Sequence, residues 1–380
     1  MMISLKKTQL NVLHVIDHFG LGGAANATYY ILKEFSGKDI EVDLVTTSPT
    51  GKFEQDRMGE NITIHKLPVR KKRIHYWTQK EVLSYSWKAY RYIKRLKEER
   101  KYDLIHAFFG IPCGAIAYRF RKEMPYVVSL RGSDVPGFNE RFSFQYVFLK
   151  PIIRRIWRNA KAVVANSQGL KELALKTDKN VKIDIIYNGI NIEDFPPKEY
   201  GRNNEVVILT VARLIKRKGI DDLIRAIPSV IKEYKDIKVR IIGEGNMEKE
   251  LKDLAEKLGV SEYIEFLGYI PHDRISKYYS SSDIFVLPSK NEGMSNTVLE
   301  AMTSGLPIIT TDTGGTTELI DDNGIIVPIG NSGAISRAII EYVRNPELIK
   351  EHGSKSRSIA ENMDWSKVAG EYYKLYEKIV

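Results

Sequence analysis

The sequence predicts two doubly wound α/β domains in tandem, and three observations support this fold class. Its 380 residues exceed what one ordinary hydrophobic core holds, so two domains are expected. Short apolar runs bounded by turn residues alternate with helical segments, which is the pattern of a parallel sheet covered by helices on both faces. This alternation is interrupted at residues 190–204, where proline, glycine and polar residues collect, and it then resumes.

The first domain is expected over residues 1–190. Its first strand leads into a glycine turn and a helix, GLGGAANATYYILKEF. The strands are short apolar runs that end in polar or turn residues, as buried parallel strands do. The five expected strands are NVLHVIDHF, IEVDLVTTS, YDLIHAFF, YVVSLRGSD and AKAVVANS.

The second domain is expected over residues 205–365, where helical segments such as GIDDLIRAIPSVIKEY separate the strands. In open α/β sheets, ligands bind beyond the carboxyl ends of the strands. The active site is therefore expected in the cleft between two such domains. The six expected strands are VVILTVARL, IKVRIIGEG, YIEFLGYI, DIFVLPS, LPIITTD and NGIIVPIG.

Charge is unevenly distributed along the chain, whose formal net charge is +10. Residues 1–185 hold 33 lysines and arginines against 18 acidic residues, whereas the remainder is net acidic. The basic half is expected to favour an anionic partner: a lipid surface, a phosphorylated substrate or nucleic acid. The single cysteine, Cys113, excludes a disulfide within the chain and a multi-cysteine zinc site. No apolar run reaches the roughly 18–20 residues of a membrane span and no signal peptide is recognised, so a cytoplasmic protein is expected.

The stretch DIFVLPSKNEGMSNTVLEAMTSG predicts a strand, a loop and a helix. Ser295 is the expected N-cap of a helix over 296–303 that stops at Gly305. The N–H groups of its first turn form a ready anion site. Glu292 and Glu300 are separated by seven residues and would flank that anion, a spacing that suits a sugar nucleotide. The alternative is that Glu292 satisfies the helix dipole and that Glu300 is a solvated helix residue.

A second loop, VARLIKRKG, follows the first strand of the second domain. Its Arg213 and Lys218 could neutralise a diphosphate and stabilise it as a leaving group. The alternative is a solvated basic loop, which suits Lys216 and Arg217 better than it suits Arg213 and Lys218.

With these motifs, the chain resembles the retaining glycosyltransferases of family 4, which have the GT-B fold. The resemblance covers essentially the whole length. It rests on the E-x7-E element EGMSNTVLEAM together with TVARLIKRKG, IIGEG, FLGYI, TDTGGTTELI and NGIIVPIG, in family order. It also implies that residues 366–380 form a terminal helix that packs back on the first domain.

The resemblance implies a donor site that needs no metal and no other cofactor, and the sequence has no D-x-D pair to chelate one. Glu292 would contact the donor sugar and act in catalysis, and Glu300 would contact the ribose. Arg213 and Lys218 would hold the diphosphate and, with the helix N-terminus, replace the charge of a metal ion. The other implied donor-binding residues are Gly22, Gly23, Gly293, Met294, Ser295, Asn296 and Thr297 at the phosphates, and Gly268 and Tyr269 beside the base.

The first domain is implied to hold the acceptor, with His106, Arg131 and Asp134 as its contacts at strand ends and His106 also in a catalytic role. Many family members have histidines where Phe108 and Arg131 stand. Arg131 therefore suggests an anionic acceptor or a contact with a donor phosphate. His106 could equally be a satisfied strand residue, partly buried in the sheet.

Two further signals have competing interpretations. Gly20-x-Gly22-x-x-Ala25 also fits the dinucleotide fingerprint, with Asp43 as the ribose acid, but the resemblance favours the glycine pair as a contact to the donor phosphates and the acceptor. Glu318 could bind sugar or nucleotide, or could cap the next helix.

The function implied is transfer of a sugar, with retention, from a UDP- or GDP-type donor. The acceptor would be a glycan, a lipid-linked or another hydroxyl compound in cell-envelope or glycoconjugate biosynthesis. The alternatives are a sugar-nucleotide epimerase of the same fold and a non-catalytic protein that binds nucleotide sugars.

Three basic segments interleave cations with aromatic residues: VRKKR, KAYRYIKRLKEERK and KPIIRRIWRNAK. A solvated helix face is the ordinary interpretation of each. Their repetition favours peripheral contact with an anionic membrane surface. Nucleic acid is not expected as a partner, because no recognised binding module is present.

Overall fold

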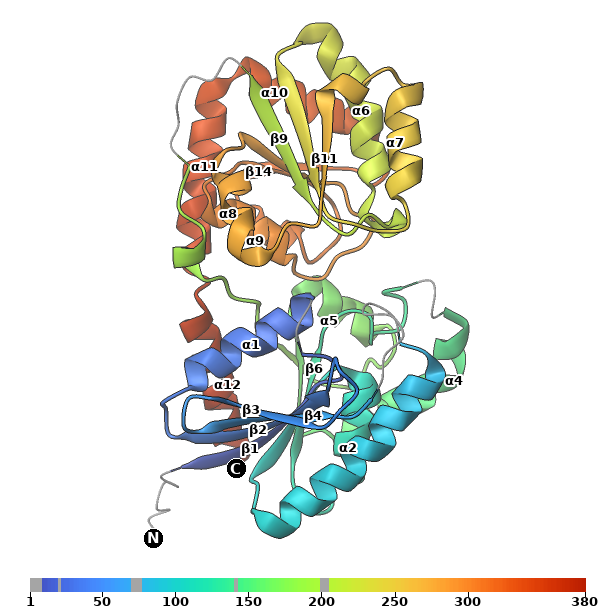
Figure 1. The fold of residues 1–380 in the computed structure, drawn as a ribbon, viewed down its shortest axis with the longest axis vertical. Helices are drawn as coiled ribbons and strands as arrows, with labels where there is room; N and C mark the ends of the chain where they lie inside the picture. The colour runs from blue at the N-terminus through green and yellow to red at the C-terminus, as the bar shows by residue number, and fades with distance from the viewer. Residues whose placement is uncertain (1–8, 20–21, 70–76, 140–142, 199–204) are drawn as a thin grey trace. The chain divides into compact units, whose positions relative to one another are not determined.

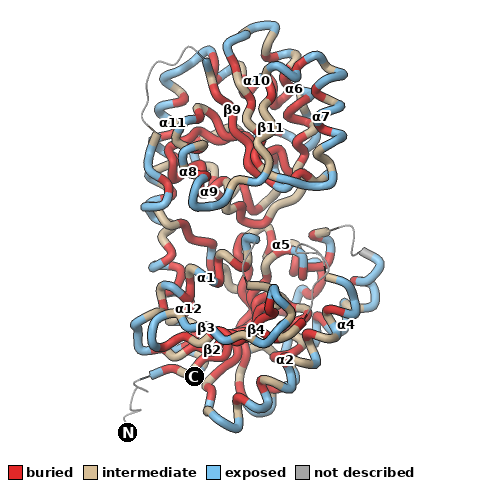
Figure 2. Tube along the Cα trace, in the orientation of Figure 1, coloured by how far each residue is buried: buried red, intermediate tan, exposed pale blue. Residues whose placement is uncertain are grey.

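The computed structural model describes residues 9–19, 22–69, 77–139, 143–198 and 205–380 (Figure 1). The chain divides into two compact units, here called unit 1 (Met1–Tyr187 with Trp365–Val380) and unit 2 (Asn188–Asp364). In both units the strands lie inside and the helices expose their outer faces (Figure 2). Each unit has a mainly parallel sheet with helices on both faces, which confirms the predicted fold class.

The sheet of unit 1 has eight strands in the order β3-β4-β2-β1-β5-β6-β7-β8. All neighbouring strands pair in parallel except β3 and β4, which are antiparallel. The central strands are apolar because both of their faces are covered by helices. The strands are β1 (Leu10–Val15), β2 (Ile40–Thr47), β3 (Glu54–Met58), β4 (Ile62–Leu67), β5 (Leu104–Phe108), β6 (Tyr126–Leu130), β7 (Ala162–Ala165) and β8 (Ile183–Ile185).

Two sets of helices cover opposite faces of this sheet, because their buried residues belong to two separate hydrophobic clusters. One face is covered by α2 (Gln79–Glu99), α3 (Ala115–Arg119), α4 (Ser143–Asn159) and α5 (Gln168–Leu175). The other face is covered by α1 (Gly23–Phe35) and α12 (Trp365–Ile379).

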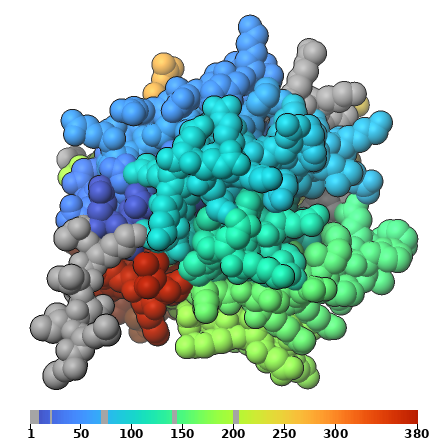
Figure 3. Space-filling view, turned by 90° about the horizontal axis from the view of Figure 1, so that it is seen from below, coloured from blue at the N-terminus to red at the C-terminus, as the bar shows by residue number. Residues whose placement is uncertain are grey.

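The C-terminal helix α12 belongs to unit 1, although the 177 residues of unit 2 precede it in the chain. The ring of Trp365 stacks on Tyr30 of α1 with centroids 5.5 Å apart, and α12 contributes five buried side chains to the core. Figure 3 shows the end of this helix (red) at the surface of unit 1, beside residues of the first strand (dark blue). The chain therefore returns to its first domain at the end.

The sheet of unit 2 has six parallel strands in the order β11-β10-β9-β12-β13-β14. The chain winds outward from β9 in one direction and from β12 in the other, so the topological switch point lies between these two strands. The strands are β9 (Val206–Val211), β10 (Ile237–Ile242), β11 (Ile264–Gly268), β12 (Ile284–Leu287), β13 (Ile308–Thr311) and β14 (Gly324–Val327).

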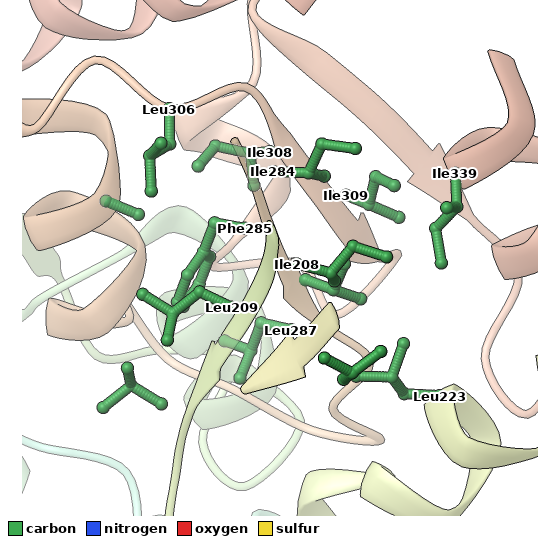
Figure 4. Close-up of a cluster of buried hydrophobic side chains, with 14 of the residues drawn as sticks. Ile208, Leu209, Leu223, Ile284, Phe285, Leu287, Leu306, Ile308, Ile309 and Ile339 are labelled. Carbon is green, nitrogen blue, oxygen red and sulfur yellow. The ribbon is translucent and has the colours of Figure 1, made fainter. Parts of the chain in front are cut away.

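One continuous hydrophobic core fills unit 2. Figure 4 shows its centre, where aliphatic side chains of β9, β12 and β13 pack beside Leu223 and Ile339 of two covering helices. This packing positions β9 and β12, and with them the start of the loops at their carboxyl ends. The helices of unit 2 are α6 (Ile220–Glu233), α7 (Glu248–Lys257), α8 (His272–Ser280), α9 (Asn296–Thr303), α10 (Ser332–Arg344) and α11 (Pro346–Ala360).

The start of unit 2 differs from the expected domain boundary. The sequence places a linker at residues 190–204 and begins the second domain at residue 205, whereas the compact unit begins at Asn188. Ile190 and Phe195 are buried in the core of unit 2, and Ile190 pairs with Asp364 in an isolated bridge. The two apolar side chains explain the difference, because burying them anchors the segment to unit 2.

Within the described residues, none of the helices combines the length and the apolar content that a bilayer span requires.

Candidate functional site

Two loops at the switch point of unit 2 are fastened to each other. One follows β9 and the other follows β12. The Lys290 N–H donates to the carbonyl of Arg217 over 2.8 Å, and the Arg217 guanidinium donates to the carbonyl of Asn291 over 3.0 Å. Gly219 has a φ of 64°, and a Cβ added there would lie 2.0 Å from the carbonyl oxygen of Pro288. Only glycine fits this close approach.

Lys218 and Glu292 form an ion pair between these loops, and their side chains are only 13% and 10% exposed. The Ser289 hydroxyl donates to the same Glu292 oxygen over 2.8 Å. Burial acts to raise the pKa of Glu292, but the charges of Lys218 and Arg217 and the hydrogen bonds outweigh it and lower that pKa. Glu292 is therefore a carboxylate. Burial lowers the pKa of Lys218 against the attraction of Glu292.

The pairing places both residues at the edge where ligands bind in such sheets. The sequence assigns Glu292 to the sugar and Lys218 to the diphosphate, and the structure shows the two in direct contact. A ligand that uses both would have to insert next to an existing pair.

Arg213 is exposed in the loop after β9, and the IIGEG loop fixes its backbone. A Cβ on Gly243 would lie 1.9 Å from the carbonyl oxygen of Ala212, and one on Gly245 would lie 2.1 Å from that of Leu214. The Leu214 N–H donates to the carbonyl of Glu244 over 2.9 Å. The glycines thus let two loops pack backbone to backbone. Sequence reasoning missed this role, and its signal is the pair of glycines just beyond a strand end.

The helix after β12 begins and ends where the sequence predicts. Ser295 is the N-cap of α9, which spans Asn296–Thr303. The Ser295 hydroxyl bonds to Thr297 Oγ1 over 3.1 Å and makes no side-chain cap to the helix backbone. The anion site at the first turn is therefore not filled by the cap residue.

Asn188 supports this helix start, a role that sequence reasoning did not find. Its side-chain amide donates to Asn296 Oδ1 over 2.9 Å, and its backbone N–H points to the sulfur of Met294 at 3.1 Å. Gly293, Met294 and Ser295 are buried, and Asn296 and Thr297 are partly exposed.

Glu300 is buried within α9 at 6% exposure, so the alternative that it is a solvated helix residue is wrong. The Tyr279 hydroxyl donates to Glu300 Oε2 over 2.6 Å, and His272 Nε2 lies 3.5 Å from Oε1. The contact with Glu300 raises the pKa of His272. The ring of Phe195 packs against both partners, with centroids 5.6 Å from each. Tyr279 and His272 carry no motif signal of their own, because only folding brings α8 next to α9.

Gly268 and Tyr269 stand at the carboxyl end of β11, at the edge of the same sheet. Gly268 has a φ of 64°, and its carbonyl accepts the N–H of Gly243 over 2.8 Å. Tyr269 is exposed. The loop after β13 reaches the site as well, because Gly314 forms an isolated parallel bridge with Glu292. Glu318 lies on a short 3-10 helix, Thr317–Leu319, that follows this loop.

In unit 1, the glycine turn precedes α1 as expected. Gly22 has a φ of 111° and no neighbour within 4 Å of an added Cβ, and Gly23 is the first residue of the helix. Gly20 lies outside the described residues. The dinucleotide interpretation with Asp43 as the ribose acid is wrong, because Asp43 is buried in the middle of β2. Its carboxylate accepts hydrogen bonds from Tyr102 (2.7 Å) and Arg100 (3.3 Å) and contacts His65 Nε2 at 2.7 Å.

His106 is an interior residue, which favours the second interpretation of this histidine. It is fully buried, with its Nδ1 2.5 Å from the Tyr376 hydroxyl and its Nε2 2.7 Å from Ser129 Oγ. Burial keeps its pKa well below the usual value. The ring of His14 lies 5.1 Å away, centroid to centroid. Its position is thus fixed by α12 and β6, and both nitrogens are already engaged.

Asp134 and Arg131 have different environments at the end of β6. Asp134 is buried and accepts hydrogen bonds from the N–H groups of Gly110 (2.7 Å) and Arg131 (3.0 Å), so it ties two strand-end loops together. The Arg131 guanidinium lies 5.3 Å from the centre of the Phe108 ring and donates to the Tyr372 hydroxyl over 3.3 Å. The two positions at which the sequence departs from the family pattern therefore pack against each other.

Among the residues that the structure describes, no three His, Cys, Asp or Glu side chains are arranged to hold a metal ion.

Two family models match the chain. The model described as Glycosyltransferase Family 4 matches residues 21–194, and the model described as Glycosyl transferases group 1 matches residues 191–359. The two matches together cover most of the chain and correspond to its two halves.

Comparisons with individual proteins also identify glycosyltransferases as similar to this chain. An uncharacterized glycosyltransferase of Methanocaldococcus jannaschii is 32% identical over 277 residues, which are 69% of this chain and 70% of that protein. Sucrose-phosphate synthase from Thermosynechococcus elongatus has a similar structure, with a TM-score of 0.83 at 18% identity over 97% of this chain and 99% of that one. The Anabaena protein HepE, solved with UDP and glucose, has a TM-score of 0.75 at 20% identity over 97% and 99% of the two chains.

Proposed function

The chain belongs to the family 4 glycosyltransferases, enzymes of the GT-B fold, and from that premise we propose which reaction it performs. It moves a sugar from a UDP- or GDP-type donor, with retention, to a hydroxyl acceptor on a glycan or a lipid-linked compound. The donor binds at the switch point of unit 2.

The largely buried ion pair of Lys218 and Glu292 is the observation that supports this proposal most strongly. An ion pair taken out of water stabilises a fold poorly, because desolvation offsets much of the attraction. A charged pair held at a ligand-binding edge by two fastened loops is typical of a functional site. The Anabaena neighbour of the same fold was solved with UDP and glucose, which supports a donor of this chemistry.

Each part of the site has a role in this proposal. Arg213, Lys218 and the first turn of α9 neutralise the diphosphate, and these fixed charges stand where other enzymes use a metal ion. Glu292 accepts hydrogen bonds from the sugar hydroxyls. Glu300, oriented by Tyr279 and contacted by His272, accepts from the ribose.

The proposed reaction retains the anomeric configuration. The bond from the anomeric carbon to the leaving phosphate oxygen breaks while the acceptor oxygen bonds to the same face, through an oxocarbenium-like state. The proton of the acceptor hydroxyl passes to the leaving phosphate oxygen. No other base is required, which is consistent with a buried His106 that has both nitrogens bonded.

The acceptor is proposed to contact unit 1 near Gly22, Gly23 and Arg131. The guanidinium of Arg131 suits an acceptor that carries a negative charge, because it presents several donors in a planar fork. His106 and Asp134 position this region rather than touch the acceptor, since both are buried and already bonded. Peripheral contact with an anionic membrane also belongs to the proposal.

A donor panel tests the proposal. The purified protein is mixed with UDP, GDP, ADP and their sugars, and thermal stability and sugar transfer to a panel of hydroxyl acceptors are measured. One nucleotide diphosphate and its sugar are expected to raise the unfolding temperature, and the sugar should appear on an acceptor with unchanged anomeric configuration. Release of a free sugar isomer would show an epimerase, and binding without turnover a non-catalytic protein. No stabilisation at millimolar nucleotide contradicts the donor site itself.

A further inference from the structure

The helix α4 of unit 1 exposes a continuous apolar stripe. Phe144, Val147, Phe148 and Ile152 are 77%, 64%, 67% and 51% exposed, and the first three are among the most exposed large apolar side chains of the described residues. Their spacing of three and four residues puts them on one side of the helix. The rings of Phe144 and Phe148 contact each other, with centroids 5.4 Å apart. A folded protein rarely leaves such a stripe in water without a partner.

The opposite side of α4 anchors the helix to unit 1. Its buried side chains, among them Ile153, Ile156 and Trp157, belong to the hydrophobic cluster under this face of the sheet. The helix is thus fixed through one side while its apolar stripe points away from the core. From Phe144 to Ile152 the stripe is about 12 Å long, at about 1.5 Å per residue.

All charged residues of α4 are basic. Its sequence SFQYVFLKPIIRRIWRN has four cations and no acidic residue. Lys150, next to the stripe in sequence, is exposed. Arg155 and Arg158 continue beyond the stripe toward the C-terminus, where Arg155 donates to the Tyr118 hydroxyl over 2.6 Å and Arg158 pairs with Asp178 at 2.7 Å. The helix therefore combines large apolar side chains with an entirely positive charge.

The helix α2 also exposes apolar side chains on the same side of unit 1, although it carries acidic as well as basic residues. Its buried residues belong to the same cluster as those of α4, while Leu83, Trp87 and Tyr90 are exposed at helical spacing. The Arg91 guanidinium lies 4.8 Å from the centre of the Trp87 ring. Tryptophan and arginine together are typical of the interface between lipid headgroups and acyl chains. The third basic segment, VRKKR, lies outside the described residues except for Val69.

We propose that α4 lies in the headgroup region of an anionic lipid bilayer, with its phenylalanines inserted among the acyl chains and its cations at the phosphates. The charge of the helix decides between this partner and a second copy of the chain. Two copies joined through α4 would bring cation against cation, whereas an anionic bilayer neutralises them. The combination of apolar stripe and basic face is that of an interfacial helix.

Vesicle binding tests the proposal independently of catalysis and of the donor site. The full-length protein is mixed with neutral phosphatidylcholine vesicles and with vesicles containing 30% phosphatidylglycerol (about a third anionic lipid, enough to give a negative surface), and bound protein is measured by flotation. Binding is expected to the anionic vesicles alone and to weaken when salt rises from about 0.1 M to 1 M, because the Debye length falls from about 10 Å to 3 Å.

Three variants locate the contact. Phe144→Ser with Phe148→Ser is expected to weaken binding at least about tenfold, since two large apolar side chains no longer leave water. Lys150→Glu is expected to weaken it about tenfold through a change of two charges. The matched control is Ile329→Ser, an exposed apolar residue of unit 2, which should leave binding unchanged. The unfolding temperature of each variant verifies that it is folded.

A fourth variant reports insertion directly. In Phe144→Trp the new indole is expected to shift its fluorescence to shorter wavelength with anionic vesicles and to be quenched by bromine-labelled acyl chains. The proposal is overturned if the wild type ignores anionic vesicles, or if the double serine variant binds as well as the wild type. It is also overturned if the double variant abolishes a dimer in solution while vesicle binding is absent, which would make a second copy the partner.

Discussion

The carboxyl edges of the two sheets use polar groups in different ways. In unit 2 the two acids of the donor-site loop and helix have side-chain partners: Glu292 pairs with Lys218, and Glu300 is held by Tyr279. In unit 1 the buried acid at this edge, Asp134, is bonded to backbone N–H groups of two loops. His106, in a neighbouring strand, bonds to Ser129 and to Tyr376 of α12. A pair of opposite charges at a ligand-binding edge is typical of a functional site, whereas polar groups bonded to one another or to the backbone hold elements together.

The difference predicts that losing Glu292 affects turnover more than any substitution in unit 1. Glu292→Gln keeps the shape but removes the carboxylate beside Lys218 and the proposed sugar. Sugar transfer is expected to fall about 100-fold or more, the scale of losing one electrostatic contact at a reacting centre. The measurement is kcat/KM for the donor.

Asp321→Asn is the matched control, an exposed acid of the same unit that no interpretation places in the donor site, and its effect should be small. If kcat/KM for the donor falls equally in the two variants, the special role of the Lys218–Glu292 pair is contradicted.

Tyr279→Phe is expected to affect donor binding next most strongly. It removes the hydroxyl that donates to Glu300 over 2.6 Å. A hydrogen bond to a charged group contributes about 1.5–3 kcal/mol, so KM for the donor should rise about tenfold or more while kcat changes less. Tyr278→Phe, on the same helix, is the control and should behave as the wild type. An unchanged KM for the donor in Tyr279→Phe would contradict a role for Glu300 in nucleotide binding.

Unit 1 is expected to lose stability as pH falls below about 6.5, the usual pKa of histidine. Burial lowers the pKa of His14 to about 3 and also lowers that of His106. The unfolded chain therefore binds protons that the folded unit cannot take up. The contribution of the two histidines to the free energy of unfolding is fully present above pH 6.5. Below that pH, each histidine lowers the free energy of unfolding by up to about 1.4 kcal/mol per pH unit.

The four tryptophans make this loss measurable, because Trp77, Trp87, Trp157 and Trp365 all belong to unit 1. Urea unfolding followed by tryptophan fluorescence between pH 7 and 5 therefore reports unit 1. His14→Phe should make the dependence on pH shallower. A midpoint that stays constant over this range would contradict the burial of neutral histidines in unit 1.

Arg131→Lys is expected to have the smallest effect. The lysine keeps the charge but loses the planar contact with Phe108, so KM for an anionic acceptor should rise about fivefold, the scale of a cation–π contact. KM for the donor should not change. Arg121→Lys is the control, because Arg121 also lies over a ring in unit 1, that of Tyr118 at 4.1 Å. A change in the KM for the donor alone would show that Arg131 contacts the donor and not the acceptor.

The sequence predicts the features that local patterns determine, but it does not predict the contacts that depend on the tertiary fold. The two α/β domains, the bounds of α9 and its Ser295 cap follow from local patterns, because apolar runs, cap residues and glycines act over a few positions. The E-x7-E spacing likewise identifies Glu292 and Glu300. Their partners do not follow, since Lys218, 74 residues before Glu292, meets it only through the strand order.

His106 illustrates the limit most clearly. Its position in a strand of the first domain is compatible with both a site residue and an interior one, and the choice depends on Tyr376, 270 residues away. Only the return of α12 to unit 1 fills the space beside it. The expected linker shows the same effect, because the burial of Ile190 and Phe195 in unit 2 depends on tertiary packing.

The central claim is that the charged edge of unit 2 binds a nucleoside diphosphate through Lys218. Calorimetric titration of UDP and GDP into the wild type, Lys218→Gln and Lys216→Gln tests it most directly. One diphosphate is expected to bind the wild type and the exposed Lys216→Gln control alike, and to bind Lys218→Gln at least about tenfold more weakly, as loss of a charged contact implies. Equal affinity of all three proteins, or no binding of either diphosphate to the wild type at millimolar concentration, would contradict it.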